Sequence, residues 1–268
     1  MHHQTSLLTL ACALASTSLQ AAEPATDDAA ELAKKLSNPV AALISVPFQN
    51  NFDFGGGPTD DGFRYTLNVQ PVVPFNLTEN WNLISRTIVP FVHQENIFGT
   101  TTQSGLSDTV QSLFLSPAKP GESGWIWGAG PVFLLPTATD DRLGTEKFGI
   151  GPTAVALKQN GGWTYGALVN HLWSVAGNGA RQDLSATFMN PFVSFTTKKQ
   201  TTLSLSTEST YDWENSEWTV PLAVSVSQLV KFGKQLVSFS LGARYYADKP
   251  TGGPDWGLRF SVTFLFPK

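Results

Sequence analysis

The stretch 256–266 alternates between apolar and polar side chains. Its even-numbered positions are all aromatic or aliphatic, and the intervening positions include Gly257, Arg259, Ser261 and Thr263. A period of two places each kind of side chain on its own face of a β-strand. The same alternation recurs at 63–70, 203–206 and 237–245. Such strands suit both a soluble sandwich and a membrane barrel, so alternation alone does not separate these two folds.

Strand length favours the membrane barrel. With 23 glycines and 17 prolines among 268 residues, the chain is poorly suited to long helices. Most of the predicted strands have about ten to fourteen residues, which is long for a soluble sheet and close to the length of a tilted membrane-crossing strand. We predict twelve strands, at 40–52, 63–75, 81–93, 106–117, 125–136, 148–157, 163–176, 184–197, 201–211, 218–230, 235–247 and 256–266.

The connections between these strands alternate between tight and long. Six longer connections carry thirteen acidic and four basic residues, whereas five tight turns carry six lysines and two glutamates. An even number of strands with both chain ends on the short-turn side is the outer-membrane arrangement. We therefore expect the acidic loops to face outside and the lysine-bearing turns to face the periplasm.

Aromatic residues gather near both ends of the predicted strands. Two bands of aromatic side chains are typical of the two membrane interfaces. One group follows the tight turns, and the other lies near the long loops: Trp81, Trp125, Trp127, Trp163 and Tyr165, against Phe52, Phe54, Phe91, Tyr211, Trp213, Trp218 and Trp256. The sequence therefore predicts an all-β transmembrane antiparallel barrel of about twelve strands.

The N-terminus differs from the rest of the chain. Residues 1–22 have a short apolar core ending in Ala21-Ala22 and read as a secretory signal peptide, with a lipoprotein site at Cys12 as the alternative. Residues 23–39 form a periplasmic arm with a short amphipathic helix at 25–37, and 40–268 form the barrel. We interpret this helix as a short amphipathic arm; the alternative is that it plugs the pore.

Seven prolines fall inside the predicted strands, which is unusual for a closed barrel. Each removes one donor from the hydrogen-bond ladder, and a closed barrel has no free edge. We expect bulges or kinks where they lie, with the freed carbonyls facing lumen water or side chains. The prolines are Pro47, Pro71, Pro90, Pro131, Pro152, Pro191 and Pro221.

Several stretches resemble a known family. They are 38–54, 127–141 and 144–158, together with Tyr211-Asp-Trp-Glu214 and 242–248. They are similar to Gram-negative outer-membrane barrels of the meta-pathway phenol-degradation family, whose members are often called transporters. The resemblance covers nearly all of the mature chain and implies an outer-membrane location and uptake of small, partly hydrophobic compounds. Such barrels usually end on an aromatic residue, whereas this chain ends in Pro267-Lys268.

The sequence carries no catalytic motif, and we predict that the protein is not an enzyme. No nucleophile elbow, metalloprotease motif, phosphate loop or dinucleotide fingerprint is present. His171 and Ser174 are the best enzymatic pair, but three residues apart on a strand they point to opposite faces. Asp140, Asp141 and Glu146 could bind a divalent cation, although a solvated loop is the simpler interpretation. We expect no cofactor and no bound metal.

The charged residues inside the strands are the candidate site. We expect them to form a constriction in the lumen, basic on one wall, with isolated rim ion pairs as the alternative. They are Arg64, Arg86, Asp108, Glu208, Arg244 and Arg259.

These observations predict an outer-membrane channel for passive passage of small, hydrophobic or aromatic solutes. The alternatives are a lipid-modifying enzyme of the outer membrane and a structural or surface-interaction barrel. The expected partners are membrane lipids, lipopolysaccharide, the barrel-assembly machinery and small solutes. The net charge of −4 argues against nucleic acid.

Overall fold

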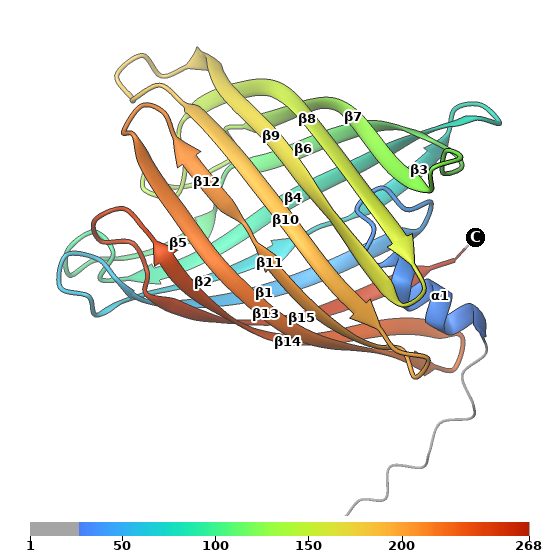
Figure 1. Cartoon of the computed structure of the whole chain (residues 1–268). Helices are drawn as coiled ribbons and strands as arrows, with labels where there is room; N and C mark the ends of the chain where they lie inside the picture. Colours follow the sequence, from blue (N-terminus) through green and yellow to red (C-terminus); the bar gives the residue numbers. More distant parts are fainter. Residues whose placement is uncertain (1–26, 268) are drawn as a thin grey trace, which may run out of the picture.

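Strands wind around a single barrel in the computed structural model, which describes residues 27–267 (Figure 1). Helix α1 spans Asp27–Lys35 and is the one helix in this range. The strands are β1 (Ile44–Gly56), β2 (Gly62–Val69), β3 (Val72–Asn76), β4 (Trp81–Glu95), β5 (Thr102–Leu106), β6 (Thr109–Pro117), β7 (Trp125–Leu135), β8 (Lys147–Asn160), β9 (Trp163–Gly177), β10 (Ser185–Thr196), β11 (Thr201–Thr207), β12 (Ser209–Asp212), β13 (Glu217–Phe232), β14 (Gln235–Asp248) and β15 (Trp256–Phe266).

The barrel closes between its first and last strands. β1 pairs antiparallel with β15, from Ile44 opposite Phe266 to Phe54 opposite Trp256. Every other neighbouring pair is also antiparallel, and β9 pairs with β10 on the far side of the barrel. Two of the predicted strands, 63–75 and 201–211, are interrupted, giving the segment pairs β2/β3 and β11/β12. The predicted strand 106–117 corresponds to β6, and β5 lies before it in a stretch predicted to be a loop. The prediction of a twelve-stranded antiparallel barrel with a short N-terminal helix is thus confirmed.

The interruptions lie at polar residues. Gln70 and Pro71 separate β2 from β3, Ser107 and Asp108 separate β5 from β6, and Glu208 separates β11 from β12. A break in regular pairing bends a strand and redirects a side chain. Gln70 and Glu208 both line the interior of the barrel, so two of the three breaks supply polar groups to the lumen.

The prolines inside the strands are accommodated by such irregularities. Pro131 and Pro152 lie directly opposite each other on β7 and β8, and the pairing of each strand with its other neighbour is interrupted there. Pro221 lies at a register shift between β13 and β14. Asn190 directly precedes Pro191, and its side-chain amide donates to the carbonyl of Thr207 at 2.9 Å. The expected bulges and side-chain substitutes for missing donors are therefore present at these prolines.

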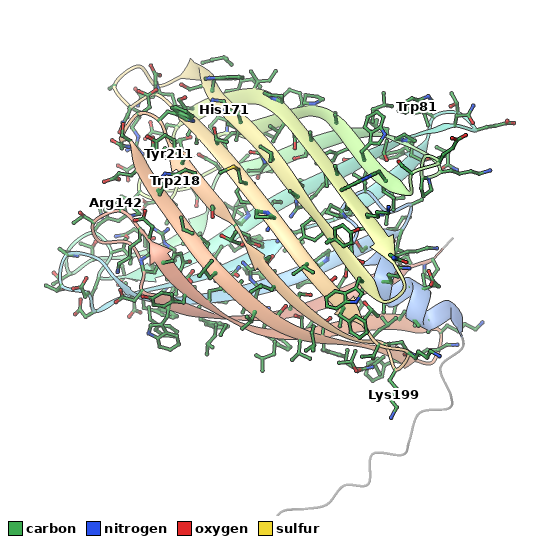
Figure 2. All side chains as sticks on the ribbon, in the orientation of Figure 1. Trp81, Arg142, His171, Lys199, Tyr211 and Trp218 are labelled. Atoms are coloured by element: carbon green, nitrogen blue, oxygen red, sulfur yellow. The ribbon has the colours of Figure 1, made fainter. Side chains whose placement is uncertain are left out.

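The outward faces carry the two aromatic bands. At the tight-turn end, Trp81 packs edge-on against Trp127, and Trp163 packs against Phe195. At the loop end Trp256 stacks on Phe54, with ring centroids 4.5 Å apart. Figure 2 shows Trp81 and the Tyr211–Trp218 pair near opposite ends of the barrel. Three of these four ring pairs lie directly opposite each other on adjacent strands, and Trp81 and Trp127 lie on either side of β6. The rings therefore form bands around the barrel rather than a core.

Apolar side chains fill part of the lumen. Ile84, Phe114, Val155, Leu157 and Leu168 form a buried cluster inside β4, β6, β8 and β9, against Val40 of the N-terminal segment. Gly128 of β7 makes room for this segment, since a Cβ there would lie 3.1 Å from Val40. The free space in the lumen is consequently displaced toward β10–β15 and β1.

Helix α1 lies at the tight-turn end, on the same side as the C-terminus (Figure 1). Ala33 of the helix and the following Ala41 and Leu43 pack against Leu229 and Leu265. The helix begins at Asp27 and ends before Asn38-Pro39, as expected from the sequence. The predicted signal peptide 1–22, including Cys12, lies outside the described residues. Within 27–267 no helix has the length and hydropathy needed to cross a membrane.

Candidate constriction in the lumen

Two buried charges meet over a glycine. Arg244 of β14 and Asp53 of β1 are both directly opposite Gly257 of the intervening strand β15. The Arg244 Nη2 lies 2.6 Å from Asp53 Oδ1, and the Tyr246 hydroxyl donates to the same oxygen at 3.0 Å. A Cβ at Gly257 would lie 2.3 Å from Asp53 Oδ1. The glycine therefore lets the two side chains close above the strand that separates them.

A second ion pair is made by Arg259, which lies two residues after Gly257 on the same face of β15. Arg259 is flanked by Gly242 on β14 and Asn51 on β1. Its Nε donates to Asn51 Oδ1 at 2.7 Å. Its two terminal nitrogens donate to the two carboxylate oxygens of Glu208, at 2.8 and 2.7 Å. This two-point geometry is the strongest form of an arginine–carboxylate contact.

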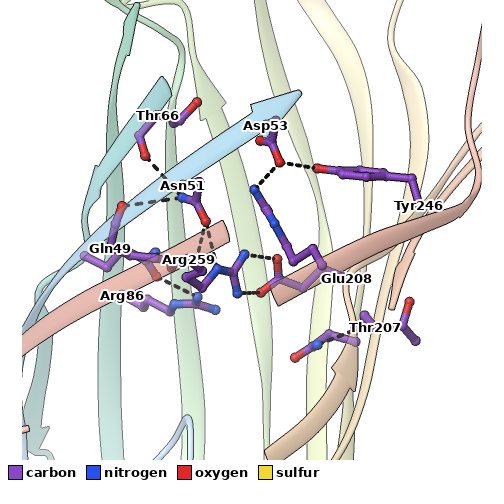
Figure 3. A network of polar contacts seen from close by, with 12 residues as sticks. Gln49, Asn51, Asp53, Thr66, Arg86, Thr207, Glu208, Tyr246 and Arg259 are labelled. Atoms are coloured by element: carbon purple, nitrogen blue, oxygen red, sulfur yellow. Dashed lines mark hydrogen bonds and ion pairs between the residues drawn. The ribbon is translucent and has the colours of Figure 1, made fainter. Parts of the chain in front are cut away.

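The remaining two lumen arginines contact amides rather than carboxylates. Arg86 Nη2 donates to Gln70 Oε1 at 3.0 Å. Arg64 Nε donates to Gln94 Oε1 at 2.8 Å. These four arginines, their two carboxylates and one tyrosine form what we call the lumen network: Asp53, Arg64, Arg86, Glu208, Arg244, Tyr246 and Arg259. Figure 3 shows part of this network in close-up, with Asp53, Glu208 and Arg259 labelled. With four arginines and two carboxylates, it carries an excess of positive charge.

Five of the six predicted site residues belong to the network. The sixth, Asp108, lies elsewhere: its carboxylate accepts from the backbone nitrogens of Ala138 and Thr145 and from the Thr145 hydroxyl. Asp108 precedes β6 and holds the loop before β8, so it does not join the constriction that the sequence predicts for these six residues. A carboxylate that accepts several N–H bonds from one loop is a local structural anchor.

Asp53 and Tyr246 belong to the network but are not among the residues predicted from the sequence. The predicted strand 40–52 ends before Asp53, whereas β1 continues to Gly56. The signal was present: Gln49, Asn51 and Asp53 continue the polar alternation of the inward face. Tyr246 has the same parity as Arg244 and so shares its face.

The lumen network lies between two cavities. One, which we call the inner cavity, has a volume of about 350 Å³ and is lined by Arg86 and Glu208 together with α1. The other, the outer cavity, has about 340 Å³ and is lined by Asp53, Arg64 and Tyr246 together with the loop 250–254. Because network residues line both, the network separates an inner from an outer compartment.

The residues considered for catalysis do not come together. His171 Nδ1 contacts the Thr187 hydroxyl at 2.7 Å, whereas Ser174 Oγ donates to Asp183 Oδ1 at 3.1 Å. Within 27–267, no group of three or more His, Cys, Asp or Glu side chains is arranged to hold a metal ion. Glu146, one of the considered ligands, instead accepts from Asn178 at 2.6 Å.

An ion pair fastens the outer loop before β10. Lys147 Nζ donates to Asp183 Oδ1 at 2.8 Å. Hydrogen bonds from Lys147 and Ser174, with the Lys147 charge, hold the pKa of Asp183 below its usual value. Asp183 is therefore the carboxylate form in this contact at neutral pH.

Comparison with known proteins gives structural rather than sequence matches. A scan against protein-family models found no match, and neither did a search of curated proteins. The COG4313 outer membrane channel from Pseudomonas putida F1 is similar with a TM-score of 0.66 at 15% identity, over 84% of this chain and 94% of that chain. Outer membrane phospholipase A from Escherichia coli has a TM-score of 0.47 at 12% identity, over 85% and 91%. The likeness to the first shows a β-barrel fold typical of Gram-negative outer-membrane proteins.

Proposed function

We propose that the protein is an outer-membrane channel that passes small solutes passively, with the lumen network as its narrow, charge-selective part. The observation that carries this proposal is the position of the network between the inner and outer cavities. A solute crossing the barrel along its axis meets the arginines and their two carboxylates there. The fold of the Pseudomonas putida channel supports the same conclusion.

The charge of the network sets the direction of selectivity. Four arginines against Asp53 and Glu208 leave an excess of two positive charges. Charged rings in a narrow, partly water-filled passage favour ions of the opposite sign. The channel therefore prefers anions over cations, and most strongly at low ionic strength.

Reversal potentials in a planar bilayer test the proposal. The purified full-length protein, in a potassium chloride gradient, should conduct with a preference for chloride that shrinks near 1 M salt, where the screening length falls to about 3 Å. Arg142→Gln, which removes a positive charge from an exposed loop outside the network, serves as the control and should keep this preference. A sealed barrel would contradict the proposal and favour a structural or surface-interaction role.

The remaining expectations fit this function. We propose that the protein resides in the outer membrane, where its exposed apolar strands and aromatic bands contact lipids and lipopolysaccharide after insertion by the barrel-assembly machinery. The resemblance to the meta-pathway phenol-degradation barrels supports solutes with an apolar or aromatic part. No catalytic step is included in this proposal, because His171 and Ser174 have separate partners.

A further inference from the structure

The lining of the inner cavity is chemically mixed. Hydroxyl side chains of β10, β11, β13 and β14 line one part of it, and apolar side chains of β9, β10 and the segment from α1 to Leu43 line other parts. The hydroxyls follow the cross-strand row of Ser194, Ser204 and Ser225, which are direct neighbours on β10, β11 and β13. Leu168 and Phe192 are among the apolar residues. At about 30 Å³ per water molecule, the volume equals roughly a dozen waters, so a small amphipathic organic molecule fits.

Arg86 lines the inner cavity together with Lys35 and the carboxylate of Glu208. Within the described residues, the one side-chain hydrogen bond of Arg86 goes to the neutral amide of Gln70. A guanidinium has five N–H donors and no acceptor. Arg259, by contrast, already donates to both carboxylate oxygens of Glu208. Arg86 therefore has donors left for a ligand, and within residues 27–267 it makes no ion pair with a carboxylate, since Glu208 in the same cavity is bound to Arg259.

Two side-chain amides connect Arg86 to Arg259. Gln70 donates through its amide nitrogen to Gln49 Oε1, so Gln70 and Gln49 link Arg86 to Arg259. In this orientation the Gln49 nitrogen donates to Asn51 Oδ1 at 3.2 Å and also faces the Arg259 guanidinium. If the Gln49 amide is turned round, its oxygen comes within 2.6 Å of Arg259 Nε, but its nitrogen then faces the nitrogen of Gln70. Two amides between two guanidiniums leave a donor facing a donor in either orientation.

A buried hydroxyl in the same cavity also lacks a partner. Ser194 is 4% exposed and lines the inner cavity. Its Oγ makes no hydrogen bond within the described part of the chain. Buried polar groups are normally satisfied, and an unpaired one at a cavity wall marks a position where a polar ligand group gains a bond.

From these observations we infer that the inner cavity is a binding site for a small amphipathic monocarboxylate. The carboxylate lies against Arg86 and accepts hydrogen bonds from the guanidinium N–H groups that Gln70 leaves free. The apolar body of the ligand lies against Leu168 and Phe192, and the hydroxyl row contacts its polar atoms. This inference deepens the proposed function by naming the solute class, and rests on it for its role in transport.

Binding to the full-length protein in detergent tests the site. Benzoate and its neutral isostere benzamide are the probes, measured by isothermal titration calorimetry. We expect benzoate to bind at least about tenfold more tightly, the scale of one charge-assisted contact. Arg86→Gln should reduce benzoate affinity to that of benzamide, while Arg142→Gln in the exposed loop should retain the preference. Equal affinities of the parent for both probes, or an unchanged preference in Arg86→Gln, would overturn the inference.

A second variant decides the matter if Arg86→Gln does not fold. Gln70→Glu places a carboxylate on Arg86 without changing side-chain shape. It should raise the thermal unfolding temperature, because this carboxylate pairs with Arg86, and should weaken benzoate binding by about tenfold or more. Benzoate affinity within about threefold of the parent contradicts the site.

The two proposals fail separately, because binding in detergent does not need an open pore. A sealed barrel that prefers benzoate contradicts the channel and leaves the carboxylate site. A conducting barrel without this preference contradicts the site alone.

Discussion

Arg259 and Glu208 face each other in a two-point contact of 2.8 and 2.7 Å, although 51 positions separate them in the sequence. The arginine projects inward from β15, and the glutamate comes from the interruption between β11 and β12. Their side chains are 17% and 33% exposed, so water in the lumen reaches the pair. The contact therefore braces the barrel interior and also sets the local charge that a solute meets.

Removing one partner of this pair should change selectivity in a direction that depends on which partner is removed. Glu208→Gln increases the positive excess of the lumen and should strengthen chloride preference, whereas Arg259→Gln should weaken it. Each variant should lower the free energy of unfolding by about 1.5–3 kcal/mol, because a charge-assisted hydrogen bond is lost. Reversal potentials and denaturant unfolding measure the two effects.

The double variant Glu208→Gln/Arg259→Gln serves as the matched control for charge, since it keeps the net charge of the parent. It should recover most of the parental chloride preference. If Glu208→Gln and Arg259→Gln shift the reversal potential in the same direction at low salt, the network does not control selectivity.

Helix α1 should restrict conduction. Ala33 and Lys35 of the helix and the following 36–39 line the inner cavity. Gln159 Nε2 fastens the helix by donating to the Lys34 carbonyl at 3.0 Å. Deleting residues 25–38 should raise single-channel conductance severalfold, because the obstruction at the periplasmic end is removed. Gln159→Ala should give an intermediate increase through looser attachment. Parental conductance in the deletion would mean that α1 leaves the passage open.

Labelling in intact cells should place the acidic loops outside. Arg142 is an exposed residue of the long loop before β8, and Figure 2 shows Arg142 and Lys199 at opposite ends of the barrel. A membrane-impermeant maleimide should label Arg142→Cys and leave Lys199→Cys unlabelled until the outer membrane is permeabilised. The reverse pattern would invert the topology.

Acid should release the outer loop at Asp183. Because the folded-state pKa of this carboxyl lies below its usual value, the contact with Lys147 is complete above the unfolded pKa of about 3.9 and is lost as the pH falls through the folded value. A spin label at Ala180→Cys should gain mobility in this acidic range. In an Asp183→Asn background the label should already be mobile at pH 7, and a pH response that persists there has another source.

Much of the barrel could be predicted because its signals are local. The alternation at 256–266 and the aromatic residues at Trp81, Trp163 and Trp256 each depend on neighbours along one strand. Lipid on one face and lumen on the other impose a period of two on every strand, whatever its partners are. The same reasoning placed Arg64, Arg86, Arg244 and Arg259 on inward faces.

The sequence by itself determined that the chain forms membrane-crossing strands and which of their faces are polar. The tertiary structure decided which charges meet. Asp53 reaches Arg244 over Gly257, Glu208 reaches Arg259 from a strand break, and Asp108 turns to a loop. These outcomes depend on the stagger between strands far apart in the sequence and on breaks that redirect single side chains. Neither property has a local period, because both arise only when the barrel closes.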